Sequence, residues 1–309
     1  VLSYFYCMRI RASTIGVLLL AIGSMGFIQA ITSFKPSSTT STVINHNYYS
    51  VSYSEKYEQA EWVAYKLTSA MIAGYAERKN NFKEDPLVTT RSATLADYKG
   101  SGYDRGHLCP AADMKISQEA MNESFYMSNM SPQDPSFNRG IWKSLEEKVR
   151  SWAATEGEVY VVTGGVLTSV NKTIGANHVG VPQEYYKIVY DYSGSNSKMI
   201  GFVLPNKKGE KQLSEYVVPV NRIETITGID FFPQLSDELE EALESHSNYS
   251  SWVSSAAPAP VYKPSQSSST TKSSSSAQCK GISTSAGVRC RNKTKNSNGY
   301  CHHHQGQFR

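Results

Sequence analysis

The chain has 309 residues, of which 39% are hydrophobic, and this length accommodates one large domain or two small ones with a substantial core. The formal net charge of +4 is unevenly distributed, because residues 1–253 carry 23 basic and 27 acidic side chains whereas residues 254–309 carry eight basic side chains and no acidic one. This distribution excludes a broadly basic nucleic-acid-binding fold, and it leaves room only for a local basic cleft beside a tail that can attract polyanions.

The N-terminal segment, residues 1–33, has the pattern of a targeting signal. Arg9 and Arg11 precede the uncharged run STIGVLLLAIGSMGFIQAI, and Ala30 is a small residue suited to cleavage. The run also has about the minimum length of a membrane span, so a cleaved signal peptide and an uncleaved membrane anchor both remain open. In either case we expect an exported protein, secreted, periplasmic or extracellular. Residues 34–45 are polar, and we expect a spacer there.

The first strands are predicted after this spacer. NYYSVSYS and AEWVAYKLT alternate apolar and polar residues on either side of Glu55–Tyr57, which is typical of a β-hairpin with one buried face. Further along, glycines before and inside ADYKGSGYDRGHLCPA place His107 at the junction of a strand and a loop. SQEAMNESF predicts a short helix with Ser117 as its N-cap.

The clearest helix is predicted over FNRGIWKSLEEKVRSWAATEG, because its large apolar residues recur at three- and four-residue spacing and Gly157 ends it. Three strands are expected next, in EVYVVTGGV, YYKIVYDY and KMIGFVLP, and then helices in VNRIETITGI and SDELEEALESH. Strands that alternate irregularly with few helices predict an α+β fold with a mainly antiparallel central sheet flanked by helices.

The domain boundaries follow from composition. We expect the folded domain over residues 46–248 and a Ser/Pro-rich flexible linker over 249–278. The remaining segment, 279–309, is basic and contains Cys and His residues.

Four of these tail residues have the types found in a zinc site. Cys279, Cys290 and Cys301 are evenly spaced, and His304 follows three residues later. Three thiolates and one imidazole would complete a tetrahedral structural Zn²⁺ site, and the segment resembles a short Cys₃His module found at the end of various bacterial proteins. It lacks a C-x-x-C pair, so the alternative is a basic tail whose cysteines oxidise after export.

The stretch GYDRGHLCPAADM contains the first candidate for catalysis. His107 has an ordinary pKa near neutrality, so it could transfer a proton, although a lone histidine is more often simply buried. In the long helix, Asn138 and Glu146 lie eight residues apart, so an ideal α-helix would place them on one gently drifting stripe about 12 Å apart. The alternative is that Asn138 only starts the helix and that Glu146 pairs with Arg150.

Several separated motifs together resemble the DNA/RNA non-specific endonuclease family, over roughly residues 46–233. These motifs are the run Asp104–His107, SNMSPQ followed by FNRGIW, and the final LEEK, with RKNNFKEDP upstream and VTGGV and VPQEYYK downstream. The resemblance implies a ββα-metal active site and an enzyme that hydrolyses the phosphodiester bonds of DNA and RNA.

The resemblance also implies a role for each matching residue. His107 is the general base, and Arg105 and Arg78 bind the scissile phosphate. Asn138 is the direct ligand of Mg²⁺, or of another divalent cation such as Mn²⁺, and Glu146 holds a water of that ion. Asn129, also grouped with the catalytic residues, helps to fix the site around the histidine.

Several points stay open at this stage. Lys79 stands beside Arg78, so either side chain could reach the phosphate; Asp104 is expected to brace the loop, and Cys109 is expected to pack rather than react. No element is suited to reading base edges, so weak sequence preference is expected. The rival hypothesis is a non-catalytic nucleic-acid-binding or surface protein that uses the basic Cys/His tail. The sequence does not determine the oligomeric state.

Overall fold

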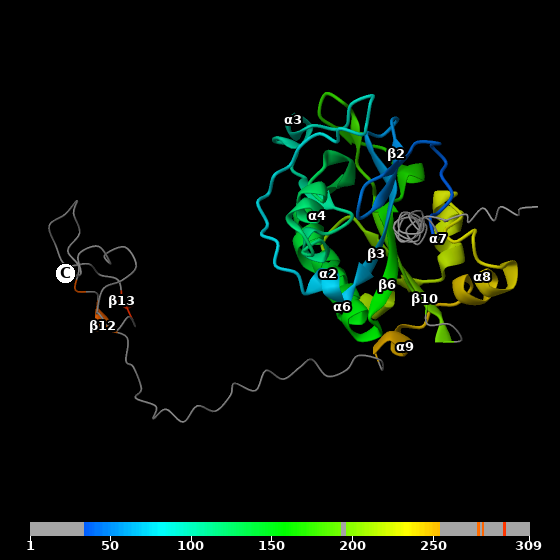
Figure 1. Ribbon diagram of the computed structural model, residues 1–309. Helices are drawn as coiled ribbons and strands as arrows, with labels where there is room; N and C mark the ends of the chain where they lie inside the picture. Colours follow the sequence, from blue (N-terminus) through cyan, green and yellow to red (C-terminus); the bar gives the residue numbers. More distant parts are fainter. Residues whose placement is uncertain (1–33, 193–195, 254–276, 279, 281–292, 295–309) are drawn as a thin grey trace, which may run out of the picture. The chain divides into compact units, whose positions relative to one another are not determined.

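The computed structural model describes residues 34–192, 196–253, 277–278, 280 and 293–294 (Figure 1). The chain divides into two compact units, Val1–Ala259 and Pro260–Arg309. The expected targeting segment and the four expected zinc ligands, Cys279, Cys290, Cys301 and His304, lie outside the described residues. Within the described part of the chain, no helix is long and apolar enough to span a membrane.

The first unit is built on a seven-stranded sheet in which all neighbouring strands are antiparallel. Its strands, in spatial order, are β1 (Val43–Asn45), β2 (Ser50–Ser54), β3 (Gln59–Thr68), β6 (Glu158–Gly165), β9 (Glu184–Asp191), β10 (Lys198–Pro205) and β11 (Val217–Val218). The predicted hairpin is confirmed, because β2 and β3 pair on either side of the turn that contains Glu55–Tyr57. The expectation of a single buried face is wrong, because the residues of both strands are buried on both faces. The three later predicted strands are observed as β6, β9 and β10.

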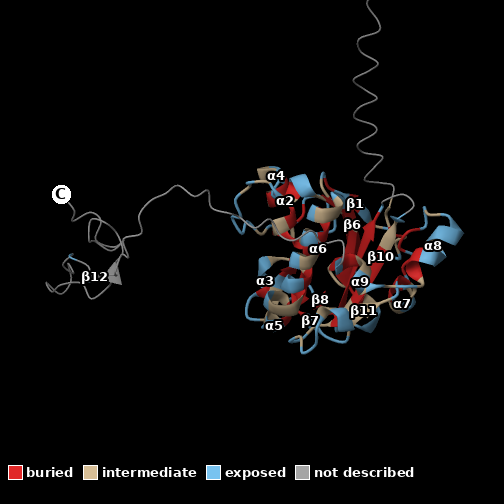
Figure 2. Cartoon of the chain, turned by 90° about the horizontal axis from the view of Figure 1, so that it is seen from below, coloured by how far each residue is buried: buried red, intermediate tan, exposed pale blue. Residues whose placement is uncertain are grey.

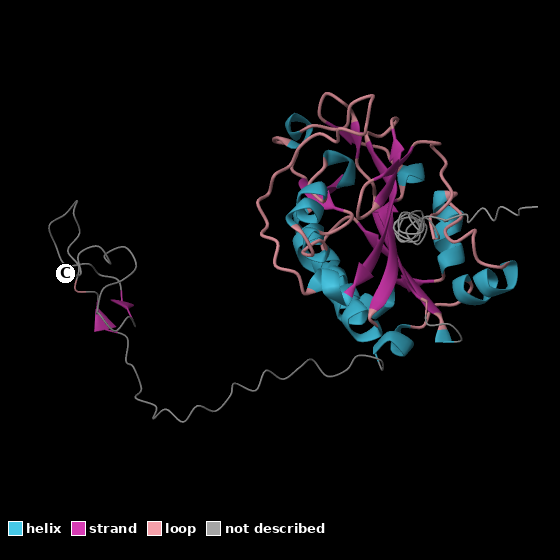
Figure 3. Ribbon diagram, in the orientation of Figure 1, coloured by secondary structure: helices cyan, strands magenta, loops and turns pink. Residues whose placement is uncertain are grey.

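Helices cover both faces of the sheet (Figures 1 and 3). One face packs against α2 (Ser69–Ile72) and α6 (Lys143–Glu156), and the other packs against α7 (Val220–Thr227) and α8 (Asp237–Glu244). Both faces bury apolar side chains because each strand alternates its residues between two cores. The buried residues accordingly run along the sheet and along the inner sides of the helices (Figure 2). The predicted α+β fold with a large antiparallel sheet is confirmed.

A smaller substructure projects from the α6 side. Its two strands, β4 (Asp104–His107) and β5 (Met130–Gln133), pair antiparallel, with His107 opposite Met130. The chain then continues through a short helix, α5 (Pro135–Phe137), and a wide π-type turn, η3 (Asn138–Trp142), into α6. Two strands and a helix in this order form a ββα unit.

The remaining elements are short. They are α3 (Leu95–Tyr98), η1 (Ala111–Asp113), α4 (Gln118–Glu123), η2 (Met127–Asn129), η4 (Leu167–Ser169), β7 (Thr173–Ile174), β8 (Val179–Gly180), η6 (Leu213–Tyr216) and α9 (Tyr249–Val253). The Oγ of Ser117 accepts the amide hydrogen of Ala120, so Ser117 caps α4 as predicted. In the second unit, β12 (Ala277–Gln278) pairs with β13 (Lys293–Thr294).

Three sequence-based expectations are wrong in their boundaries. The expected spacer 34–45 contains β1, and Phe34 lies 4.6 Å from the ring of Tyr160. The expected linker from residue 249 begins with α9, where Trp252 is fully buried 4.9 Å from the ring of Trp152. Composition did not reveal that either segment belongs to the folded domain, because a single aromatic side chain can pack a mainly polar segment against the core.

The third expectation concerned the long helix. It does not run regularly from residue 137, because Gly140 has non-helical dihedral angles (φ −107°, ψ −112°) inside η3. The regular helix begins at Lys143 and ends before Gly157, whose φ of 89° suits glycine. The apolar residues that predicted the helix, among them Leu145, Val149 and Trp152, are buried as expected.

Candidate active site

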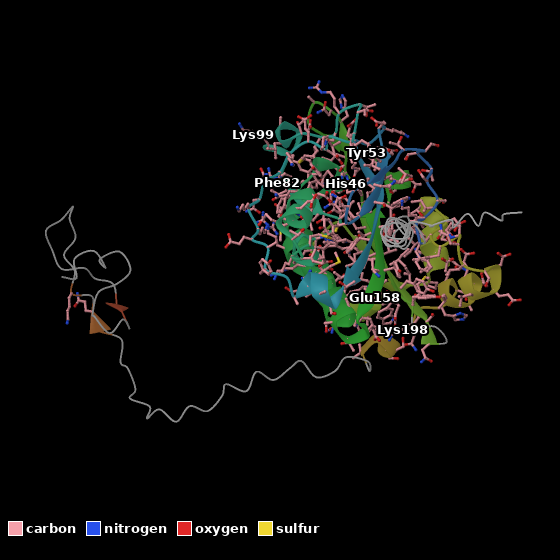
Figure 4. The ribbon with its side chains drawn as sticks, viewed as in Figure 1. His46, Tyr53, Phe82, Lys99, Glu158 and Lys198 are labelled. Atoms are coloured by element: carbon pink, nitrogen blue, oxygen red, sulfur yellow. The ribbon has the colours of Figure 1, made fainter. Side chains whose placement is uncertain are left out.

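A cleft of about 640 Å³ opens beside the ββα unit. It contains five basic side chains and two carboxylates. The lining residues are Arg78, Asn80, Phe82, Asp104, Arg105, His107, Pro110, Ala111, Ala112, Asn138, Arg139, Lys143, Glu146 and Arg150. Phe82, one of the lining residues, lies on the α4 side of the sheet, and Glu158 and Lys198 lie at the opposite end of the domain from it (Figure 4). A net acidic domain therefore has a locally basic cleft, as the charge distribution indicated.

His107 ends β4 at the wall of this cleft, in agreement with its predicted place at a strand–loop junction. The side chain is nearly buried, with Phe125 edge-on at 4.8 Å and Phe82 at 5.8 Å. The pKa of His107 is lowered from 6.5 to about 3, mainly by burial and in addition by the charges of Arg78 and Arg105. Its Nε2 atom has no hydrogen-bond partner within the described structure. A neutral imidazole with a free nitrogen can accept a proton.

Two guanidinium groups face the histidine, each placed on an aromatic ring. Arg105 stacks over Phe82 at 4.3 Å and Arg78 lies 5.2 Å from the centroid of Phe125. Arg78 also donates from Nε to Asn80 Oδ1 at 2.7 Å. Both arginines line the cleft, whereas Lys79 is not among its lining residues. Exposed guanidinium groups beside a neutral histidine suit a bound phosphate diester.

Asn138 enters the cleft from η3, and its amide has a defined orientation. Its Nδ2 donates to Asp104 Oδ2 at 2.9 Å, and Arg139 donates to the same oxygen at 2.8 Å. A carboxylate oxygen only accepts hydrogen bonds, so the nitrogen of the amide must face Asp104 and its Oδ1 must face away. Asp104 thus braces the start of the helix, and it leaves the Oδ1 of Asn138 as an available oxygen donor.

The wide turn explains how Asn138 and Glu146 share this cleft. Asp134 caps the preceding helix by accepting from the amides of Ser136 and Phe137. The chain then passes through η3, where Gly140 breaks the helical register. The ideal α-helical stripe expected for residues 138–146 is therefore not the observed geometry, although both side chains line one cleft as expected.

Glu146 lies half-buried at the cleft, next to a buried charge cluster that the sequence did not indicate. Asp113 accepts hydrogen bonds from Arg150 Nη1 and from the hydroxyl of Tyr65, both at 2.8 Å. The expected alternative, a Glu146–Arg150 surface pair, is not observed because Arg150 pairs with Asp113. Burial raises the pKa of the Glu146 carboxyl, and the nearby Lys187 ammonium acts to lower it.

Lys187 is the functional-site neighbour that sequence reasoning missed. It lies in the middle of β9, is 1% exposed, and its Nζ has no hydrogen-bond partner in the described part of the chain. The ammonium lies 4.7 Å over the ring of Trp142, one turn before Glu146. A signal was present in YYKIVYDY, because strand alternation puts Lys187 on the same face as the core residues Tyr185 and Val189.

Asn129 lies behind the site rather than in the cleft. It is fully buried, and its amide accepts from Cys109 N and donates to the carbonyls of Cys109 and Ser124. These bonds fix the loop that follows His107, which is a positioning role. Cys109 is a buried free thiol, and burial raises its pKa, so it packs and does not act as a nucleophile.

The residues of the cleft fit a hydrated hard cation. Among the described residues, no cluster of three or more His, Cys, Asp or Glu side chains is arranged to hold a metal ion. Asp104 and Asn80 also line the cleft, but their side-chain oxygens accept hydrogen bonds from Arg139, Asn138 and Arg78. Asn138 Oδ1 and the Glu146 carboxylate remain as oxygen donors for a cation. Mg²⁺ retains several waters and needs few protein ligands, so this donor set suits Mg²⁺ and does not suit a dehydrated ion.

Comparison with known proteins agrees with this geometry. Human mitochondrial endonuclease G is 34% identical over 202 residues, which cover 60% of this chain and 68% of that protein. Nuclease C1 of Cunninghamella echinulata var. echinulata is 34% identical over 224 residues, which cover 67% and 89% respectively.

The fold is similar to solved structures as well. A crystal structure of an EndoG/EndoGI complex superposes with a TM-score of 0.62 at 32% identity, covering 67% of this chain and 91% of that chain. The family model described as DNA/RNA non-specific endonuclease matches residues 29–238. The chain belongs to the DNA/RNA non-specific endonuclease family, a family of nucleic acid hydrolases.

Proposed function

We propose that this protein is a Mg²⁺-dependent endonuclease that cleaves DNA and RNA with little sequence preference. The observation that carries the proposal is the convergence in one cleft of a neutral His107 with a free Nε2, two exposed guanidinium groups and the outward-facing Oδ1 of Asn138.

In this proposal Arg78 and Arg105 hold the non-bridging oxygens of the scissile phosphate. His107 Nε2 takes a proton from the attacking water as a new P–O bond forms and the bond to the leaving sugar oxygen breaks. The bound phosphate also brings negative charge beside the two arginines, which offsets their effect and makes the imidazole more basic in the complex.

Asn138 Oδ1 would hold the cation directly, and Glu146 would accept hydrogen bonds from its water ligands. A bound Mg²⁺ supplies Lewis-acid stabilisation of the charge that develops on the phosphoryl and leaving oxygens. Asp104 contributes by orienting the Asn138 amide, and Asn129 contributes by fixing the loop behind His107.

The test uses the purified protein with plasmid DNA and with total RNA, with Mg²⁺ and with EDTA. We expect cleavage of both substrates in Mg²⁺, none in EDTA, and a loss of about 10²–10⁴-fold in His107→Ala. Near-normal turnover by folded His107→Ala would remove His107 from the mechanism. Binding of both nucleic acids without cleavage would instead support the non-catalytic alternative.

We also propose export, from Arg9, Arg11 and the apolar run that follows them. Fractionation of the producing cells with mass spectrometry of the protein's N-terminus tests this. Export with cleavage near Ala30 supports a signal peptide, recovery in membranes with the run intact supports an anchor, and an intact cytosolic protein contradicts both.

A further inference from the structure

The loop that follows β10, residues 206–212, is fastened to the entrance of the active-site helix. Asn206 Nδ2 donates to the carbonyl of Pro132 at 3.0 Å, and Asn206 Oδ1 accepts from the amide of Asp134 at 2.8 Å. Asp134 caps the short helix that leads directly into Asn138. One end of the loop is therefore fixed beside the cleft.

The middle of the loop contacts the same helix start. A Cβ atom added to Gly209 would lie 2.6 Å from the Cβ of Ile141, so only glycine allows this approach. Ile141 stands between Arg139 and Lys143, which both line the cleft. The residues on either side of Gly209 are thereby held close to the cleft rim.

The two segments joined by the Gly209–Ile141 contact carry five cationic residues, and we call them the cationic strip: Arg139, Lys143, Lys207, Lys208 and Lys211. The three loop lysines are exposed, and their ammonium groups have no hydrogen bond or salt bridge to any described residue. The side chains of Arg139 and Lys143 are 71% and 61% exposed.

Acidic groups neutralise the strip only in part. Asp104 pairs with Arg139, and Glu147 lies 3.7 Å from Lys143. Glu210 lies in the loop itself, between Lys208 and Lys211. The excess of positive charge at this position contrasts with the net negative charge of residues 1–253, so it marks a local surface for a polyanion.

We propose that the cationic strip binds the sugar–phosphate backbone of the nucleic acid substrate beyond the scissile phosphate. This inference rests on the proposed function. The strip is continuous with the cleft through Arg139 and Lys143, which favours the substrate itself over an acidic protein. The cations of the strip are spread over two segments of the chain, so together they can contact more than one phosphate of the backbone.

The test compares two double variants of the full chain. The strip variant carries Lys207→Gln and Lys208→Gln. The matched control carries Lys56→Gln and Arg222→Gln, which also remove two exposed charges. Lys56 lies in the β2–β3 turn and lines a separate cavity, which also includes Thr227 of α7. Arg222 lies in the same helix, α7, so both control positions are away from the cleft. Thermal unfolding checks that all three proteins are equally folded.

Two substrates separate backbone binding from chemistry. Each lysine–phosphate contact contributes a slope of about −0.9 to the dependence of log affinity on log salt. On long duplex DNA we plot log kcat/KM against log salt concentration. We expect the slope of the strip variant to be less negative than that of the wild type by about 1.8. The wild type would therefore weaken about 12-fold more than the variant between 50 and 200 mM salt. On bis(p-nitrophenyl) phosphate, which has no flanking phosphates, we expect equal rates for the wild type and both variants.

The outcomes are distinguishable from failure of the proposed function. If the wild type cleaves neither substrate, the proposed function fails. If the wild type cleaves DNA but the strip variant and the control have the same salt slope, the strip does not bind the substrate, and an acidic protein becomes its better partner. A charge-preserving variant, Gly209→Val, displaces the loop from Ile141 and should reproduce part of the loss in slope.

Discussion

The buried, neutral state of His107 predicts an acid-sensitive stability that can be measured without substrate or metal. The pKa of this residue falls from 6.5 in the unfolded chain to about 3 in the folded protein. Because the folded pKa is depressed, the unfolded state binds the proton first as pH falls. The residue therefore costs no stability above pH 6.5, and its cost grows as pH falls from 6.5 toward 3.

The magnitude follows from the two pKa values. At pH 6 the unfolded chain gains about 0.8 kcal/mol from protonating this histidine, and at pH 5 it gains about 2 kcal/mol, whereas the folded protein gains almost nothing. Against His107→Gln, which has no titrating group at this position, the wild type should lose about 2 kcal/mol of additional unfolding free energy between pH 8 and pH 5. Other titrating groups are common to both proteins and cancel in this difference.

The assay is urea unfolding at pH 8, 7, 6 and 5, followed by tryptophan fluorescence. All four tryptophans are buried in the folded domain: Trp62, Trp142, Trp152 and Trp252. Arg105→Gln provides an internal check, because removing one of the two charges that depress the pKa should reduce the acid loss. Parallel pH profiles for the wild type and His107→Gln would refute the assigned burial and charge environment of the imidazole.

Three further predictions concern the metal site, the buried lysine and the C-terminal helix. Asn138→Ala should raise the Mg²⁺ concentration needed for half-maximal cleavage. Glu146→Gln should raise it less, because an amide oxygen still accepts a hydrogen bond from water. Mg²⁺ titrations in which both variants lose equal activity at every Mg²⁺ concentration would argue against both assignments. Lys187→Met should leave the melting temperature unchanged or higher, because it removes a buried ammonium group that has no hydrogen-bond partner among the described residues. It should nevertheless increase the Mg²⁺ requirement, because the carboxylate of Glu146 loses a nearby cation. An unaltered Mg²⁺ titration would limit Lys187 to packing. Trp252→Ala should destabilise the domain by about 3–5 kcal/mol, measured by urea unfolding, whereas a loss below about 1 kcal/mol would mean that α9 is dispensable.

The sequence alone determined the elements whose pattern is periodic and continuous. Alternation predicted the β2–β3 hairpin, the strands β6, β9 and β10 were expected in EVYVVTGGV, YYKIVYDY and KMIGFVLP, and three- and four-residue spacing predicted α6 up to Gly157. An element that packs against a core keeps its large apolar residues in a regular local arrangement, so the sequence shows it without its packing partner. The family was identifiable for a related reason, since its motifs are short local runs in a fixed order.

Tertiary structure alone decided the contacts between residues far apart in the chain. Asp104 orients the amide of Asn138 across 34 residues, and the Asp113–Arg150 pair spans 37. Neither partnership follows from spacing, because the ββα unit, and not the helix period, brings the partners together. The place of Arg78 in the cleft has the same origin, since its guanidinium lies over the ring of Phe125, 47 residues further along the chain.

The boundary errors at residues 34–45 and at residue 249 and the buried lysine have a common physical reason. Phe34, Lys187 and Trp252 lie in segments whose local composition is polar or mixed. Phe34 is partly buried and the other two are fully buried, in each case by packing against elements distant in sequence. Burial is a property of the assembled layers, so composition reports it only when many neighbouring residues share it. Whether a single aromatic residue or a single lysine is buried depends on the surface that the folded sheet presents to it.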